Sequence, residues 1–191
     1  MNKQLNTAIA ALFLATASMT AVAVENESKI SYDYVYGGLA SLTVDGISGS
    51  LDLTQIGITG SLTDNIAMGF STTWNRNLPA VDLRINTFDV MYHTPLSNST
   101  DLQVGVSRTN ATITGGYASA SATSTGYSLG VETMLTDDAF ASFTIAGASG
   151  DSTTATQLEV GTYVTDSISI GAGIVSEGTV DTTFAGVSFH Y

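Results

Sequence analysis

The residues of this sequence that could do chemistry are mainly carboxylates. The chain has 17 Asp and Glu residues against five Lys and Arg, and its formal net charge at pH 7 is −12. It has only two histidines, His93 and His190, and no cysteine. A nucleophile paired with an activating base is hard to assemble from this set. We therefore expect a protein that is not an enzyme and that uses no cofactor and no metal ion.

Basic residues are too few to bind a polyanion. Beyond the first few residues the cations are only Lys29, Arg76, Arg84 and Arg108, and they are scattered along the chain. Binding of nucleic acid depends on clustered Lys and Arg side chains that displace the counterions of the phosphates. Nucleic acid is therefore excluded as a partner.

The N-terminus has the form of a secretory signal peptide. Lys3 supplies the positive charge, residues 7–16 form a short apolar segment, and Ala21-Val22-Ala23 is a small-x-small cleavage site. The unbroken apolar run at 8–15 is far shorter than the ~20 residues of a membrane-spanning helix. We predict a signal peptide at 1–23, cleaved after Ala23, and a single domain at 24–191.

Beyond the signal peptide the sequence alternates with period two, which is the pattern of half-buried strands. The clearest run places Ile66, Met68, Phe70 and Trp74 opposite small residues such as Gly69 and Ser71. Three segments also share the order strand, Leu/Val-Thr-Asp, strand, in which Asp favours a tight turn. They are 56–71, 129–144 and 158–173, and Pro95–Thr100 is a variant of the same turn.

These turns predict ten strands, although eight remain possible. Leu51 and Leu53 differ in parity from Ile56 and Ile58, which suggests a bulge or a later strand start. The longest connection, 110–126, is of low complexity and is predicted to be a link. Strands are expected near 29–40, 49–62, 65–75, 82–93, 101–109, 124–134, 139–148, 155–164, 167–175 and 181–191.

Three features favour a closed membrane barrel over a soluble β-sandwich, which stays the alternative as a periplasmic or secreted binding module. Only 12% of the residues are charged, against a typical ~25%. Carboxylates such as Asp101 and Glu177 are expected in turns and links, where a charge costs little in a membrane. Aromatic residues lie near strand ends, as in the girdles of membrane barrels: Tyr32, Tyr36, Trp74, Tyr92 and Tyr191.

The C-terminus then suggests a family. The segment 184–191 (FAGVSFHY) ends on Tyr191, with Phe189 and Val187 at alternate positions before it. It resembles the last strand of small Gram-negative outer-membrane β-barrels, the porin-like class. The resemblance implies a closed antiparallel up-and-down transmembrane barrel in the outer membrane, in contact with its lipid and lipopolysaccharide. It also implies that the barrel assembly machinery reads this strand.

The alternation also predicts which carboxylates face the lumen. With the large apolar residues facing lipid, the inward-facing candidates are Asp33, Asp89, Glu132 and Glu159. Inward-facing neighbours are mostly Gly and Ser, which would leave room for water. One hypothesis is a narrow channel for small solutes, preferably cations. The other is a structural or surface protein whose lumen carboxylates only hydrogen-bond to nearby polar groups, since small barrels hold little more than side chains.

Overall fold

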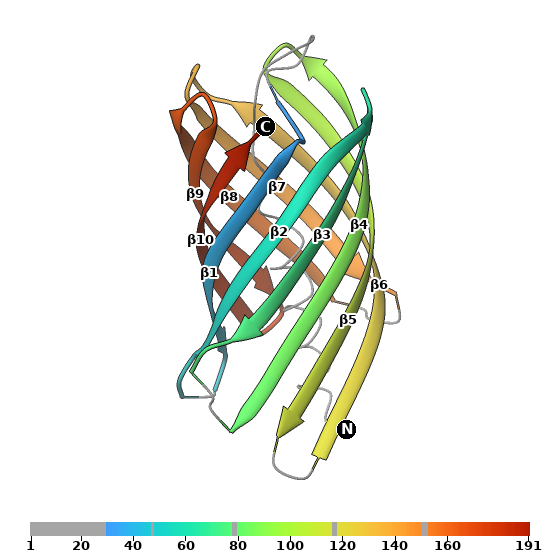
Figure 1. Cartoon of the computed structure of the whole chain (residues 1–191), viewed down its shortest axis with the longest axis vertical. Helices are drawn as coiled ribbons and strands as arrows, with labels where there is room; N and C mark the ends of the chain where they lie inside the picture. Colours follow the sequence, from blue (N-terminus) through green and yellow to red (C-terminus); the bar gives the residue numbers. More distant parts are fainter. Residues whose placement is uncertain (1–29, 47, 78–79, 116–117, 150–152) are drawn as a thin grey trace.

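The computed structural model describes residues 30–46, 48–77, 80–115, 118–149 and 153–191. The predicted signal peptide and Lys29 lie outside these residues. Ten strands follow one another along the chain (Figure 1). They are β1 (Tyr34–Val44), β2 (Leu51–Thr63), β3 (Ile66–Asn75), β4 (Val81–Ser97), β5 (Thr100–Gly115), β6 (Ala118–Met134), β7 (Ala139–Ala148), β8 (Thr154–Thr165), β9 (Ile168–Glu177) and β10 (Val180–His190).

The sheet closes on itself. Each strand pairs antiparallel with its neighbours in sequence, and β1 pairs with β10 from Tyr34↔His190 to Val44↔Val180. The ten-strand prediction is confirmed, and the alternative of a sandwich of two packed sheets is wrong.

No helix in the described part of the chain is long and apolar enough to span a membrane.

The two ends of the barrel differ. Short turns join β2 to β3, β4 to β5, β6 to β7 and β8 to β9 at one end, which we name the turn end. The C-terminus also lies there (Figure 1). The remaining connections lie at the opposite end, the link end. The predicted turns are confirmed at all four positions.

Alternation sorts the side chains between the two faces of the wall. On the outer face of β3, Phe70 is 50% exposed, while its inward-facing neighbours Gly69 and Ser71 are buried. The other strands follow the same rule. Large apolar side chains exposed on the outer face include Leu39, Ile58, Val106, Leu129, Phe143, Val160, Ile170 and Val187.

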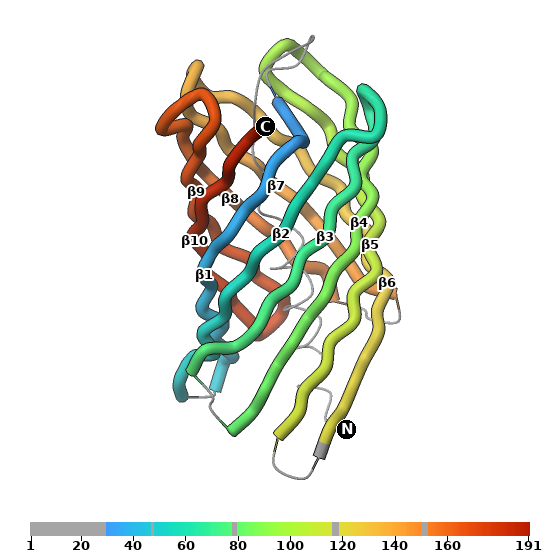
Figure 2. Tube along the Cα trace, viewed as in Figure 1, coloured from blue at the N-terminus to red at the C-terminus, as the bar shows by residue number. Residues whose placement is uncertain are grey.

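The segment predicted as a link is instead a long hairpin. The strands β4, β5 and β6 have 17, 16 and 17 residues, and β5 pairs with β6 from Thr100↔Thr133 to Gly115↔Ala118. These strands extend beyond the others at the link end (Figure 2). Thr, Ser and Ala continue the period-two pattern through 110–126, so low complexity here does not end the strands.

Leu51 and Leu53 are not part of a bulge. The β1–β2 register is regular from Leu42↔Leu51 to Tyr34↔Thr59, and the irregularity of β2 lies near its turn, between Ser61 and Thr63. The change of parity has another cause: Leu53 is 1% exposed and points inward, whereas Ile56 and Ile58 lie on the outer face. Apolar residues therefore line part of the lumen.

Tyr32 and Tyr36 also differ from their prediction. They are 2% and 7% exposed and lie inside the barrel, so they are not members of an outer aromatic girdle. Tyr92 and Tyr191 are exposed at the turn end, as expected. The inward tyrosine rings need space, and glycines on neighbouring strands provide it, because a Cβ at Gly57 would overlap the ring of Tyr36.

Replacing an inward glycine should destabilise the barrel. At Gly161 an added Cβ would overlap the ring of Phe140 and lie 2.6 Å from the backbone oxygen of Ile170. We expect Gly161→Ala to lower the free energy of unfolding by about 1–3 kcal/mol through overpacking. Urea titration in lipid vesicles, followed by the fluorescence of the single tryptophan, measures this.

The matched control is Gly37→Ala, where an added Cβ meets nothing closer than 3.8 Å. Equal stability losses in the two variants would contradict the packing explanation.

Candidate functional site: the barrel lumen

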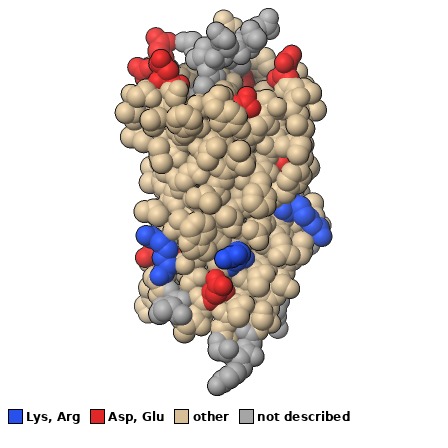
Figure 3. All heavy atoms as spheres, in the orientation of Figure 1, with Lys and Arg blue, Asp and Glu red and all other residues tan. Residues whose placement is uncertain are grey.

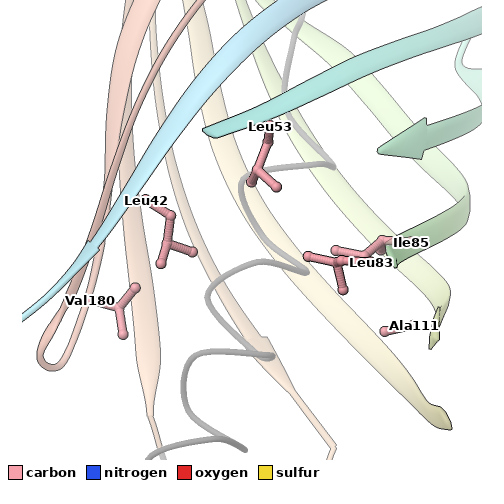
Figure 4. Close-up of a cluster of buried hydrophobic side chains, with 6 residues drawn as sticks. All are labelled: Leu42, Leu53, Leu83, Ile85, Ala111 and Val180. Carbon is pink, nitrogen blue, oxygen red and sulfur yellow. The ribbon is translucent and has the colours of Figure 1, made fainter. Parts of the chain in front are cut away.

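The lumen near the link end is lined by aliphatic side chains. They come from five strands, β1, β2, β4, β5 and β10, and point inward from the wall (Figure 4). The cluster, which we name the apolar belt, consists of Leu42, Leu53, Leu83, Ile85, Ala111 and Val180. Leu51 and Ile113 pack against it. This end of the lumen therefore resembles a hydrophobic core more than a water-filled pore.

A cavity of about 80 Å³ lies between the apolar belt and the turn end. Its lining combines aromatic, acidic, small polar and aliphatic side chains. The residues that matter most below are Tyr34, Tyr36, Asp89, Gln103, Ser128 and Gln157. Because ~10–15 Å³ of such cavity volume holds one water molecule, this cavity has room for several water molecules. The polar side chains of this lining can bind water or a polar solute group.

A hydrogen-bonded polar cluster fills the turn end beside β5. Tyr32 donates to a carboxylate oxygen of Asp101 (3.1 Å). The amide of Gln103 donates to Glu132 (2.7 Å) and to the Tyr32 hydroxyl (3.2 Å). Nδ1 of His93 lies 3.6 Å from Asp101, and the His93 ring packs against the Tyr32 ring at a tilt of 32°, with 3.8 Å between centroids. Burial raises the pKa of the Tyr32 hydroxyl far above its usual value, so that this group remains a donor.

A second cluster surrounds His190. Its Nε2 lies 3.1 Å from Oγ of Ser169, and its ring centroid is 5.4 Å from that of Tyr163. Sequence reasoning expected no such serine–histidine pair. Nδ1 of His190 has no hydrogen-bond partner among the described residues, so no carboxylate orients the ring as in a catalytic triad. The absence of enzymatic activity stays a prediction.

The lumen face carries five carboxylates, and every described arginine lies elsewhere. Asp89, Asp101, Glu132, Glu159 and Glu177 occupy inward-facing positions of their strands. Arg76, Arg84 and Arg108 are exposed outside the lumen. On the face shown in Figure 3 the basic side chains gather in the lower half, toward the link end. The Asp, Glu and Arg side chains that face the described lumen are thus all acidic.

The structure places the four predicted lumen carboxylates differently. Glu132 and Glu159 are buried inside, and Asp89 lies inside against Gly69. Asp33 does not face the lumen, because its neighbours Tyr32 and Tyr34 do. Its carboxylate accepts a hydrogen bond from the backbone N–H of Ser61 (2.6 Å).

Sequence reasoning missed two lumen carboxylates and the apolar belt. Asp101 and Glu177 were expected in connections, but they are 0% and 1% exposed. Asp101 and Gln103 are two residues apart on β5 and therefore face the same side of the wall. This alternation could have predicted that Asp101 faces the lumen. The expectation that turn and link charges face water therefore fails where a strand begins or ends within the lumen.

Solved outer-membrane proteins share this architecture. The KdgM porin aligns with a TM-score of 0.51 at 7% identity, over 82% of this chain and 99% of that protein. The COG4313 outer membrane channel from Pseudomonas putida F1 gives 0.51 at 10% identity, over 90% and 100%. The chain has the fold of the Gram-negative outer-membrane β-barrels. Its sequence matches no protein-family model and no curated protein.

Removing the Tyr32 hydroxyl should weaken the barrel at its turn end. Tyr32→Phe takes a donor from Asp101 and an acceptor from Gln103 in a buried site. The expected loss in the free energy of unfolding is about 1–3 kcal/mol.

The measurement is urea unfolding in vesicles. The control is Tyr92→Phe, whose ring is 50% exposed on the outer face. If the two variants were equally stable, the buried cluster would contribute nothing to folding.

Proposed function

We propose that this protein is an outer-membrane channel that passes small solutes through a narrow lumen and prefers cations. The observation that carries the proposal is the one-signed lumen, in which five carboxylates face inward and the described arginines lie outside. Pores select for cations with rings of acidic side chains that attract the permeating ion and repel anions. Asp89 is best placed to act, because it lines the central cavity.

The outer face supports a membrane location. A closed barrel leaves no strand edge unpaired around its circumference, as a bilayer requires. From the turn end as far as Arg108 on β5, its outward side chains are mostly large and apolar, and a charge at mid-membrane would cost up to about 2–4 kcal/mol. Figure 3 shows few charged side chains in this middle region. The predicted signal peptide supplies the route of export.

A structural or surface role is the second candidate function. The hydrogen-bonded cluster around Tyr32 and the apolar belt lie at the two ends of the lumen, and a barrel that stays closed at both would serve as a rigid scaffold. Conductance separates the two candidates.

The channel should conduct cations in planar bilayers. We expect single-channel steps in KCl, with a reversal potential under a salt gradient that indicates cation preference. Asp89→Asn combined with Glu159→Gln should reduce this preference at least severalfold, because it removes two lumen charges. Asp166→Asn, an exposed carboxylate in the β8–β9 turn, should leave it unchanged. The absence of steps, or anion preference, would refute the channel.

The same geometry suggests an orientation and partners. We place the link end outside the cell, since the long strands β4, β5 and β6 extend beyond the others there, and it is the outer side of bacterial barrels that carries the longer protrusions. Arg84, exposed near the link-end start of β4, would then lie near lipopolysaccharide phosphates. The last strand, with outward Val187 and Phe189, would be the element that the barrel assembly machinery recognises.

Single cysteines test this orientation cleanly, because the chain has none of its own. Ala120→Cys, in the long hairpin, should react with a membrane-impermeant maleimide on intact cells. Asp166→Cys, in a short turn, should react only after the outer membrane is permeabilised. The reverse labelling pattern would show that the barrel is inserted the other way.

A further inference from the structure

One edge of the extended wall has no partner strand. β6 begins at Ala118, but its pairing with β7 starts only at Gly126, opposite Ala148. The backbone of residues 118–124, which we name the free edge, therefore lacks a neighbouring strand on this side among the described residues. At ~3.3 Å per residue the free edge is ~23 Å long, which is the length of an ordinary strand. It lies at the link end, where β4, β5 and β6 extend beyond the other strands (Figure 2).

The free edge presents regularly spaced backbone donors and acceptors. The carbonyl of Thr125 accepts a hydrogen bond from the backbone N–H of Ser149 (2.7 Å), so the backbone groups of Thr125 face β7. Because backbone groups alternate in direction along a strand, those of Ser119, Ser121 and Thr123 face the same side. The N–H and carbonyl groups of these three residues thus form a template for a further strand.

The other side of this extended wall is sealed. Past the last β3–β4 pair, the side chain of Asn75 takes the place of a strand. It donates to the carbonyl of Val81 (2.8 Å) and accepts a hydrogen bond from the N–H of Leu83 (2.7 Å). The free edge (ASASATS) has no Lys, Pro or bulge, which are the features that normally keep an open edge from pairing, and its register with β5 is regular. The structure thus leaves one edge of the extension open to pairing.

The charge beside the free edge is positive. Among the described outward side chains of β5, β6 and β7, only that of Arg108 is charged. Its guanidinium donates to Oγ1 of Thr125 (2.7 Å), which places it beside β6 at the end of the free edge. A guanidinium carries five N–H donors, so several remain for a carboxylate. A strand that brings an acidic side chain to this point gains an ion pair.

A second copy of the barrel does not fit the free edge. Strands of membrane barrels are tilted by ~35–45°, so two copies related by a two-fold axis along the membrane normal would cross their β6 strands at about 70–90°. Paired strands differ in direction by only ~20–25°. A copy related by translation would have to offer its β4 edge, which Asn75 seals. An extended peptide segment is free of both constraints.

We propose that the free edge binds an extended segment of a partner protein, which adds a strand to β6 and carries an acidic side chain beside Arg108. Backbone hydrogen bonds to Ser119, Ser121 and Thr123 hold the segment. The charge of Arg108 favours acidic sequences. With the link end outside the cell, the partner meets this protein at the cell surface. The proposal concerns the outer wall and does not rest on the channel.

The test is binding of a fluorescent nine-residue peptide of Thr and Val with a single Glu to the full-length barrel in detergent micelles, followed by anisotropy. We expect saturable binding. The same peptide with all its backbone nitrogens methylated should bind about tenfold more weakly or worse, because it has lost its donors. With Gln in place of Glu, the peptide should bind about two- to fivefold more weakly.

Two variants of the barrel locate the site. Ser121→Pro removes an N–H of the free edge and leaves the β5–β6 ladder intact, because this N–H faces away from β5. It should weaken binding about five- to tenfold, whereas the matched control, Ser121→Ala, should leave the affinity unchanged. Arg108→Gln, at an exposed position, should weaken binding of the Glu peptide and not that of the Gln peptide. It serves as the test if Ser121→Pro does not fold.

Several results would overturn the proposal. They are the absence of saturable binding, equal affinity for the fully methylated peptide, and equal affinities of Ser121→Pro and Ser121→Ala. A concentration-dependent dimer that Ser121→Pro dissociates would assign the free edge to a second copy instead of a peptide. Conductance is measured separately, so failure here leaves the proposed channel intact.

Discussion

The structure depends on closure of a single hydrogen-bonded ladder. Pairing of β1 with β10 gives every strand two neighbours, so the wall has a continuous inside and outside. Because side chains alternate along each strand, this closure sorts them into two environments. The outer one is mostly apolar between the turn end and Arg108. The inner one is small, and every side chain directed into it must fit beside those of the opposite wall.

That limited space explains the division of the lumen. Glycines beneath aromatic rings, as at Gly161 under Phe140, let large groups enter a ten-stranded barrel without distorting its wall. Aliphatic residues gather at the link end, and hydrogen-bonded polar groups gather at the turn end. The central cavity between them combines tyrosines with Asp89. The inward carboxylates, with Asp89 beside the central cavity, are the feature from which the proposed function follows.

Much of this could be predicted from the sequence, because period-two alternation and tight turns are local signals. Ten strands, four short turns and the inward parity of β4 around Asp89 are examples. At the strand ends, the opposite wall of the barrel determines which residues enter the lumen. A local sequence pattern contains no information about that wall. The local pattern therefore predicted a bulge at Leu53 and a place in the outer aromatic girdle for Tyr36, although both side chains point inward. The hairpin through 110–126 was missed because its strands are built from Thr, Ser and Ala, which also make links.

The most direct test of the central claim, a water-accessible acidic lumen inside an apolar wall, is cysteine accessibility along β4. Single cysteines at residues 87 to 91, in vesicles, would be treated with a charged methanethiosulfonate reagent that reacts only in water. The structure predicts that Asp89→Cys and Met91→Cys, beside the cavity, react, while Phe88→Cys and Val90→Cys on the outer face do not. Thr87→Cys should also stay unreactive, because Thr87 faces inward but is 0% exposed. Reaction at all five positions would contradict the lipid-facing wall. Reaction at none of them would show that the lumen is dry.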